Sequence, residues 1–418
     1  MTMTSRILLA LAAGALIGLT LAWLDPPLAV RVADAVQPVG KLWLNALQMT
    51  VVPLVLALVV IGVTTTSDAA ASGRTARRAI GVFIVLLSGS ALFAAIAAPL
   101  LLSAVPVDPT LSAALGTSVA AEGTQTTATG WAESLTSIIP SNAIMAAAQS
   151  AMLPLVVFAL FFGFALTRIQ PIRRTQIVEF LQAIADTMIV IVQWVLWAAP
   201  LGVFALILAV CARAGLSVLS ALGIYIVLQC ALYLAVTLMM MLVAVTWGGE
   251  SIRRFAAAIV PAQVVAASTQ SSLASLPAML DSAQRRLGYS PQVTALVLPM
   301  AVSLFRITSP VQYISAAAFI AWAYGIDLSA TQLATGAALA VVISLGSVGL
   351  PGQVSFMATN LPVSQAMGLP VAPLGLLLAV DTIPDMFATV GNVTADLTAT
   401  SVVARRTPHV SSAALTDP

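Results

Sequence analysis

Long apolar runs separated by short charged junctions organise the chain. We interpret as membrane spans the runs at residues 7–24, 41–66, 80–102, 140–167, 177–211, 217–246, 291–324 and 371–403. A helix needs roughly 20 apolar residues to cross the hydrocarbon core of a bilayer, so runs of this kind are typical of spans. The pattern predicts an all-α membrane protein with eight transmembrane helices.

Two further apolar segments, residues 255–280 and 333–368, differ from ordinary spans because Ser, Gly and Pro interrupt their middles. The two interruptions are Ser272-Leu-Ala-Ser275-Leu-Pro277 and Ser344-Leu-Gly-Ser347-Val-Gly349-Leu-Pro351-Gly352. A proline at membrane depth removes an amide donor, and broken backbone is tolerated there only where it is buried in protein or lines a cavity. We therefore expect two opposed re-entrant helical hairpins that meet in mid-membrane. Two kinked ordinary spans are the alternative.

The last apolar run carries a polar stripe made of Asp381, Asp385, Asn392 and Asp396. On one continuous helix their spacing places all four within about 60° of each other. An acidic side chain at membrane depth costs at least ~2.5 kcal/mol, so these carboxylates need partners, protons or ions. A solvated face of a soluble helix is the alternative, but the surrounding chain has little polar surface.

Composition supports the membrane class and excludes several others. The chain is 60% hydrophobic and only 8% charged, with a net charge of +2 that indicates no nucleic-acid partner. Its one histidine, His409, lies in the polar tail, which excludes a histidine-based metal or proton site in the membrane. Most arginines fall on one side if eight spans cross, so we expect cytoplasmic termini in a bacterial inner membrane. Arg306 is an exception, because it falls within a span.

The hairpin tips and the polar stripe suggest a binding site. The first turns of short helices present N–H groups that suit a substrate carboxylate, and the candidates for this role are Ser271, Ser272, Ser275, Gly349 and Pro351. Asp385 suits a substrate ammonium group. Asp396 and Asn392 offer oxygen ligands for a hard cation such as Na⁺, and protonation is the competing explanation for these acids.

The same residues resemble the motifs of the glutamate/aspartate and dicarboxylate/amino acid:cation symporter family. The chain has Gln270-Ser271-Ser272-Leu-Ala-Ser275-Leu-Pro277 where the family has serines before Thr-Leu-Pro, and its second interruption is similar to the family's Ser-x-Gly-Thr-x-Gly-x-Pro-Gly. The last span, Asp385-Met-Phe-Ala388-Thr389-Val-Gly-Asn392-Val-Thr-Ala-Asp396, resembles Asp-Met-Gly-Arg-Thr-x-x-Asn-Val-Thr-Gly-Asp.

The resemblance implies roles for the matching positions. Asp385 would bind the substrate amino group, and Thr389, Asn392 and Ser272 would contact the rest of the substrate. Asn392 and Asp396 would form one sodium site, with Ser344 and Ser347 in another. The resemblance also implies a homotrimer, no covalently bound cofactor, and a cation, Na⁺ or H⁺, as the coupling ion.

Two departures from the family pattern bear on the substrate and the ions. Ala388 stands where the family has an arginine that grips an acidic side chain, which favours a neutral amino acid. Phe305-Arg306-Ile307-Thr308-Ser309 replaces the family's Asn-Met-Asp-Gly-Thr, so two sodium-holding side chains are missing. We predict that Arg306 is a built-in cation, which pairs with Asp396 or Asp381 or grips a substrate carboxylate. A purely structural pairing or snorkelling is the alternative.

We therefore expect a secondary transporter that takes up a small, neutral amino acid with a cation, through an elevator motion. Residues 1–250 would be mainly scaffold and trimerisation helices, 251–404 the core transport domain, and 405–418 a cytoplasmic tail. Symport of a C4-dicarboxylate or acidic amino acid is the alternative, with Arg306 supplying the positive charge. A channel is less favoured, and an intramembrane aspartyl enzyme less still, because no activated nucleophile accompanies Asp381 and Asp385.

Overall fold

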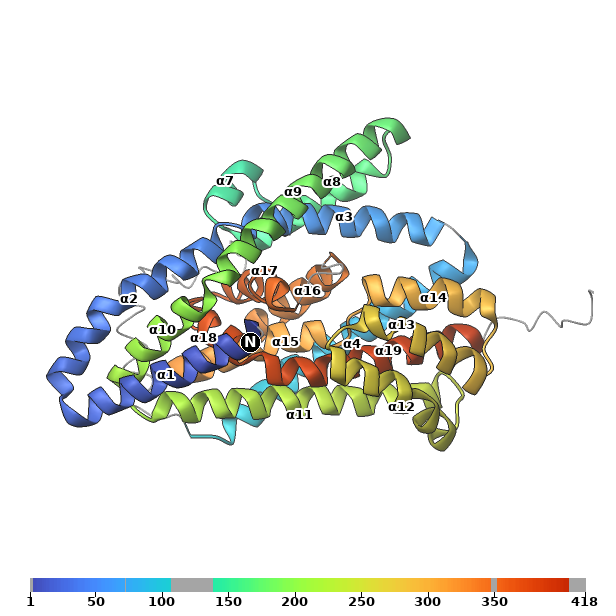
Figure 1. Cartoon of the computed structure of the whole chain (residues 1–418). Helices are drawn as coiled ribbons and strands as arrows, with labels where there is room; N and C mark the ends of the chain where they lie inside the picture. Colours follow the sequence, from blue (N-terminus) through green and yellow to red (C-terminus); the bar gives the residue numbers. More distant parts are fainter. Residues whose placement is uncertain (1–2, 72, 107–137, 347–351, 406–418) are drawn as a thin grey trace, which may run out of the picture.

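The computed structural model describes residues 3–71, 73–106, 138–346 and 352–405, and this part of the chain is helical without any strand (Figure 1). Its helices are α1 (Met3–Leu24), α2 (Pro26–Gln48), α3 (Val51–Ala71), α4 (Arg74–Ser103), α7 (Ala143–Ala148), α8 (Met152–Leu166), α9 (Pro171–Trp197), α10 (Ala199–Ala214), α11 (Ser217–Thr246), α12 (Ile252–Thr269), α13 (Ser272–Asp281), the π-helical turn η1 (Ser282–Arg286), α14 (Pro291–Leu304), α15 (Thr308–Tyr324), α16 (Ala330–Gly346), α17 (Gly352–Ala366), α18 (Leu374–Val380) and α19 (Thr382–Arg405).

The predicted all-α membrane fold is confirmed, and every predicted run lies on one helix or on a broken pair. Among the described residues, the helices long and apolar enough to cross a membrane are Pro26–Ala71, Arg74–Ser103, Pro171–Trp197, Ser217–Thr246 and Pro291–Tyr324, and the bent pair α18–α19 would make a sixth. Shorter apolar helices include the end of α1, α8, α10 and α16. The count of eight spans stays a prediction.

Several predicted spans differ from the helices that form, because the runs 140–167, 291–324 and 371–403 are each divided into two helices. The run 41–66 is part of a longer pair, because α2 already begins at Pro26, where the Asp25 carboxylate accepts the Leu28 N–H. The first part of α2 was not predicted, because its polar residues interrupt the apolar run. These residues face α10, where Asp34 forms an ion pair with Arg213. The run 177–211 is divided at Ala198 into α9 and α10.

The helices form two groups that differ in what they pack against. Helices α1, α2 and α10 pack on one another at one end of the molecule, and α3 packs with α8 and α9 above them in Figure 1. The second group surrounds α19, which contacts α4, α11, α12, α13, α14 and α15. The second half of α19 lies inside this group, because every residue from Gly391 to Val403 is buried.

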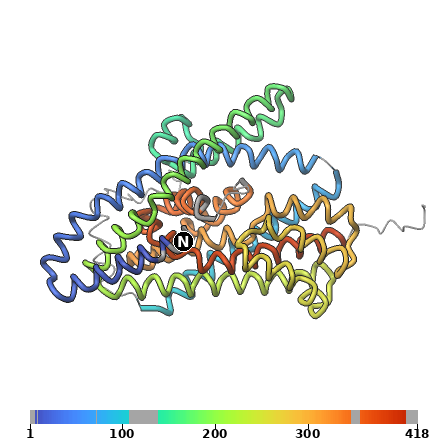
Figure 2. The backbone as a smooth tube through the Cα atoms, viewed as in Figure 1, coloured from blue at the N-terminus to red at the C-terminus, as the bar shows by residue number. Residues whose placement is uncertain are grey.

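Each of the two interrupted segments forms two helices that pack against each other. Helix α12 turns at Gln270, which has a left-handed backbone (φ 51°), and α13 returns against it. Helices α16 and α17 pack together in the same way, and Figure 2 traces the two pairs entering from opposite ends of the bundle. Their re-entrance into a bilayer stays a prediction.

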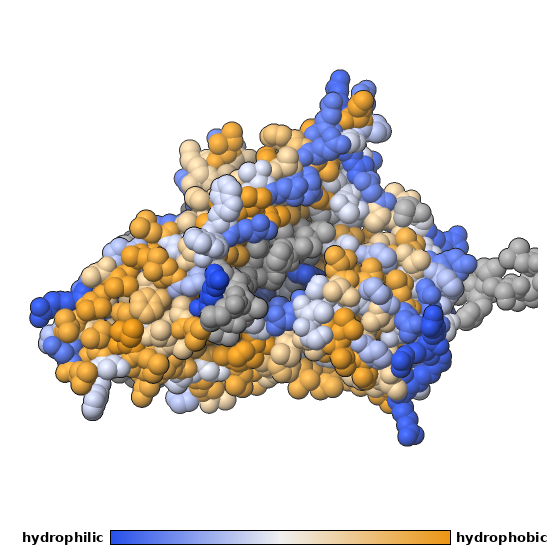
Figure 3. Space-filling view, in the orientation of Figure 1, coloured by the Kyte–Doolittle hydropathy of each residue, from blue (hydrophilic) through white to orange (hydrophobic). Residues whose placement is uncertain are grey.

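The surface agrees with the membrane class. Apolar side chains cover much of the face drawn in Figure 3, over α1, α2 and α11, and polar ones gather at the end where α12 begins and α19 ends. Exposed large apolar residues include Leu42, Trp194, Val227 and Leu242. Residues 406–418, most of the predicted tail, lie outside the described part of the chain.

Candidate functional site

Three interruptions of helical structure come together beside α19. They are the tip of the α12–α13 pair, the unwound residues 305–307 between α14 and α15, and the bend of 73° between α18 and α19. The tip is tied to the bend, because the Gln270 side-chain amide donates to the Thr382 carbonyl at 3.1 Å. Broken backbone thus converges beside α19, where the tip of the first pair is exposed and Asp396 is buried.

The tip of the first pair holds the predicted serines in three different environments. The Ser271 hydroxyl caps α13 by accepting the Ala274 N–H at 3.2 Å. Ser275 is fully buried and donates to the Ser271 carbonyl at 2.9 Å, so its hydroxyl supports the helix itself. Ser272 is buried in the first turn of α13. The amides of this first turn point toward the tip, as the binding hypothesis requires.

Asp385 lies in the first turn of α19 and is half-buried. The Thr389 hydroxyl donates to the Asp385 backbone carbonyl at 2.8 Å, so it stabilises α19 itself and does not bind the Asp385 carboxylate. Ala388 is buried and apolar, so α19 presents no cation there. The site therefore has the Asp385 carboxylate at the start of α19 and no basic residue at position 388, where the family has an arginine.

Asn392 is held by the N-terminus of α15. Its Oδ1 accepts the Thr308 backbone N–H at 3.1 Å and the Thr308 hydroxyl at 3.0 Å. The backbone N–H can only donate, so the atom facing it must be the amide oxygen. Both lone pairs of this oxygen are thereby used. Thr308, which the sequence reasoning missed, was marked only by its place directly after the break.

Asp396 lies one helical turn beyond Asn392 and is completely buried. Neither of its carboxylate oxygens has a hydrogen-bond partner among the described residues, and the buried Nε of Arg306 also has none. The positive charge of Arg306 nevertheless acts on both Asp396 and Asp385. Arg306 therefore lies close enough to both carboxylates for its charge to act on each of them, and it forms no direct ion pair with either among the described residues.

Asp381 lies at the bend between α18 and α19. The predicted stripe assumed one continuous helix, but the chain bends here, and the Asp381 carbonyl accepts the Asp385 N–H at 2.9 Å as α19 begins. Its carboxylate is buried and accepts the Gln312 side-chain amide at 3.0 Å. Arg306 is therefore associated with Asp385 and Asp396, and Gln312 supplies the partner of Asp381.

The second pair is only partly described. Ser344 is buried, and its hydroxyl donates to the Ala340 carbonyl at 2.7 Å within α16. Ser347, Gly349 and Pro351 lie outside the described residues. Within the described residues no group of three or more His, Cys, Asp or Glu side chains could hold a metal ion.

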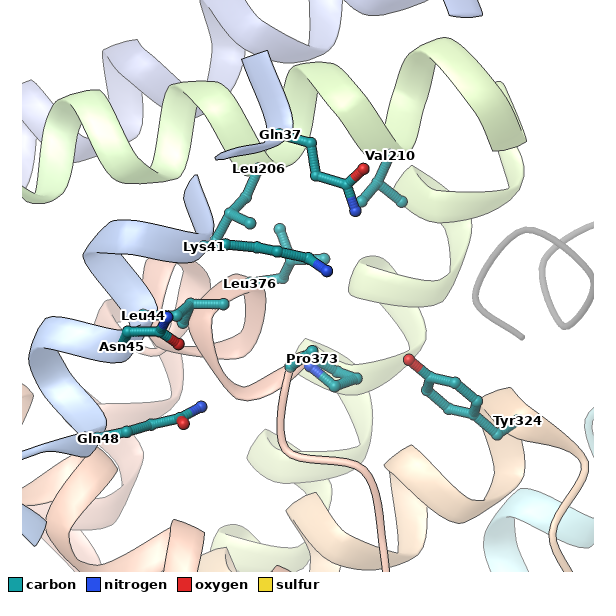
Figure 4. Close-up of a pocket in the computed structure, with 11 residues that line it drawn as sticks. Gln37, Lys41, Leu44, Asn45, Gln48, Leu206, Val210, Tyr324, Pro373 and Leu376 are labelled. Carbon is teal, nitrogen blue, oxygen red and sulfur yellow. The ribbon is translucent and has the colours of Figure 1, made fainter. Parts of the chain in front are cut away.

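A separate cavity lies between α2, α10, α18 and the end of α15 (Figure 4). Lys41 and Gln37 of α2 and Tyr324 of α15 extend into it from different sides. None of the predicted site residues lines this cavity. It lies where the group around α1, α2 and α10 meets the group around α19.

Broken helices that converge on buried carboxylates inside an apolar bundle define a multi-pass membrane transporter. The sequence model of the sodium:dicarboxylate symporter family matches residues 3–406, nearly the whole chain. The chain belongs to the sodium:dicarboxylate symporter family.

Proteins similar to this chain are named for the transport of different substrates. The chain is 29% identical over 404 residues to the proton/glutamate-aspartate symporter of Escherichia coli, covering 96% of this chain and 92% of the relative. It is 28% identical over 397 residues to C4-dicarboxylate transport protein 2 of Polaromonas naphthalenivorans, covering 94% and 86%. It is 29% identical over 401 residues to neutral amino acid transporter B(0) of Oryctolagus cuniculus, covering 85% and 71%.

Proposed function

We propose that this chain is a cation-coupled symporter of a small neutral amino acid. The observation that carries the proposal is the combination of a half-buried Asp385 with an apolar Ala388 one turn away on α19. An ammonium group would compensate the Asp385 carboxylate. No basic side chain at residue 388 is present to compensate a second carboxylate on the substrate.

The first turn of α13 would bind the other end of the substrate. The N–H groups of Ser272 and Leu273 and the partial positive charge of the helix N-terminus suit the α-carboxylate of an amino acid. Gln270 fixes this tip to the start of α19, so the two binding groups would be held at a constant separation. The name of the rabbit relative is consistent with a neutral substrate in this family.

A C4-dicarboxylate or acidic amino acid is the second candidate. It is favoured by the positive charge of Arg306, which acts on Asp385 and could instead receive a carboxylate, and by the names of the bacterial relatives. A dicarboxylate, however, would place two negative charges near Asp385, which only extra cations or protons could offset.

Transport would use an elevator-type motion in a bacterial inner membrane, with the chain assembled as a homotrimer. The moving part would comprise residues 251–404 together with α4 and α11, because these two helices pack on α15 and α19. The group of α1, α2 and α10 would be scaffold. The Gly375 contact of α18 with Leu44 and Leu206 would then be one place where the two parts slide.

The test is a thermal-shift screen of purified protein against L-alanine, L-serine, L-aspartate and succinate, with Na⁺ or choline, followed by counterflow in proteoliposomes. A ligand at 100 times its Kd stabilises by about 2.7 kcal/mol, which such a screen detects. We expect stabilisation by L-alanine or L-serine and its loss in Asp385→Asn. Stabilisation by succinate alone would overturn the neutral assignment.

A charge-gain variant sharpens this test. Ala388→Arg should transfer preference to L-aspartate, because it places a guanidinium where the substrate side chain would extend. Ala388→Gln is the matched control, since it adds comparable bulk without charge. Equal L-aspartate binding by both variants would contradict the role given to residue 388.

A further inference from the structure

The side chains predicted to hold one sodium ion do not fit that role in this structure. The Asn392 amide oxygen already accepts two hydrogen bonds from Thr308, at 3.0 and 3.1 Å, and has no lone pair left for a cation. Asp396 remains as a carboxylate ligand, but it lies within the field of the Arg306 guanidinium. A metal ion beside Asp396 would be repelled by that fixed positive charge.

Asp396 nevertheless requires a positive partner. It is completely buried, and neither carboxylate oxygen has a hydrogen-bond donor among the described residues. A carboxylate in an apolar interior is tolerated when a charge compensates it. Arg306 is the only cation that acts on Asp396 in the described part of the chain.

Arg306 lies in the break between α14 and α15, near Asp396. Helix α14 ends at Leu304 and α15 begins at Thr308, so residues 305–307 pass between two helix ends. The last carbonyls of α14 carry partial negative charge, which suits a cation in the gap. Asn392, bound to Thr308, fixes α15 against α19 one turn from Asp396.

We propose that Arg306 is a resident counter-ion that takes the place of a sodium ion at Asp396. The inference rests on the proposed cation-coupled symport and deepens it. With Arg306 beside Asp396, the protein would bind one sodium ion fewer than a symporter in which sodium compensates this carboxylate. The positive charge stays with the protein through the transport cycle. Asp385 remains the carboxylate that the substrate ammonium compensates.

Sodium alone is the probe in the closing experiment, so its result does not depend on which substrate is transported. Radioactive-sodium binding is counted on the purified full-length protein. Arg306→Met should bind one sodium ion more than the wild type, because Asp396 is left uncompensated. Arg306→Lys retains the charge and should bind the wild-type number, as should Arg253→Met, an exposed-arginine control.

Asp396→Asn supplies an independent measurement if Arg306→Met does not fold. It should leave the number of bound sodium ions unchanged, since Asp396 holds no sodium in the wild type. A loss of one bound ion in Asp396→Asn would overturn the proposal. An unchanged count in folded Arg306→Met would overturn it as well.

The pair can also be tested without sodium. Arg306→Met leaves the buried Asp396 carboxylate uncompensated, and Asp396→Asn leaves Arg306 with only Asp385 as a counter-charge, so each variant should melt at a lower temperature than the wild type. Arg306→Met combined with Asp396→Asn removes both charges and should recover most of that loss. Additive losses in the double variant would show that the two charges do not compensate each other.

Discussion

The contact between Asn392 and Thr308 provides the most direct test of how the site is built. Asn392→Leu replaces the amide by an apolar side chain of similar length. The Thr308 hydroxyl can then turn to the Ala388 carbonyl, which lies 3.4 Å away, but the buried Thr308 N–H loses its acceptor. Capping of α15 by a side chain of α19 would be lost.

The magnitude follows from these bonds. A net hydrogen bond contributes about 1 kcal/mol, and a buried donor without a partner costs about 1–3 kcal/mol, so Asn392→Leu should destabilise by roughly 2–4 kcal/mol. Thr308→Val removes only the hydroxyl and should cost about 1 kcal/mol. Both single variants remove the same hydrogen bond between the Thr308 hydroxyl and Asn392. The destabilisation of the double variant should therefore be about 1 kcal/mol smaller than the sum of the two single effects.

Denaturant unfolding of the four proteins in detergent, with and without Na⁺, measures this cycle. We expect the same loss in Asn392→Leu under both conditions, because the amide oxygen acts as a helix cap. Strict additivity of the two single variants would refute the capping interaction. A loss that appears only in the presence of Na⁺ would instead show that Asn392 is an ion ligand.

Two further predictions concern other parts of the fold. Gly202→Ala should destabilise by about 1–3 kcal/mol, since its Cβ would lie 2.3 Å from ring atoms of Trp43, whose indole N–H is held by a carbonyl of α9. Gly223→Ala, with no atom within 4 Å of the added carbon, is the control and should be neutral or stabilising in thermal melts. Burial, and then the nearby Glu250 carboxylate, raise the pKa of Tyr289, so the folded state holds this proton more tightly and stability should fall as pH rises above about 10. Tyr289→Phe should flatten the alkaline part of the stability profile, and an unchanged slope would contradict this linkage.

Much of the architecture could be predicted from local pattern. Apolar run length identified the membrane helices, because the cost of exposing backbone in lipid leaves helices as the main solution. The serines in the segment 255–280 predicted a turn, and Ser271 does cap α13; the turn lies at Gln270, however, and the predicted interruption from Ser272 to Pro277 is helical. The start of α2 was missed, because the polar residues there are satisfied by α10, which is distant in the sequence.

The candidate site could be predicted only in part. Spacing on an ideal helix placed Asp381 with Asp385 and Asp396, but it did not reveal the bend of 73° at Asp381, where the Asp381 carbonyl still accepts the Asp385 N–H at 2.9 Å. Thr308 and Gln312 carry no motif, yet they bind Asn392 and Asp381. Their roles arise from contacts across 84 and 69 residues of chain, which no local periodicity reveals.

The amino-acid sequence alone determined that this chain is a helical membrane protein with interrupted segments and an unusual arginine, because hydropathy and helix breaking act over a few neighbouring residues. Only the tertiary structure decided which polar groups partner each other: that the Asn392 oxygen is occupied, that Asp396 has no donor among the described residues, and that the charge of Arg306 acts on two carboxylates. The physical reason is that a buried polar group takes its properties from its neighbours in space, and those neighbours come from helices far apart in the chain.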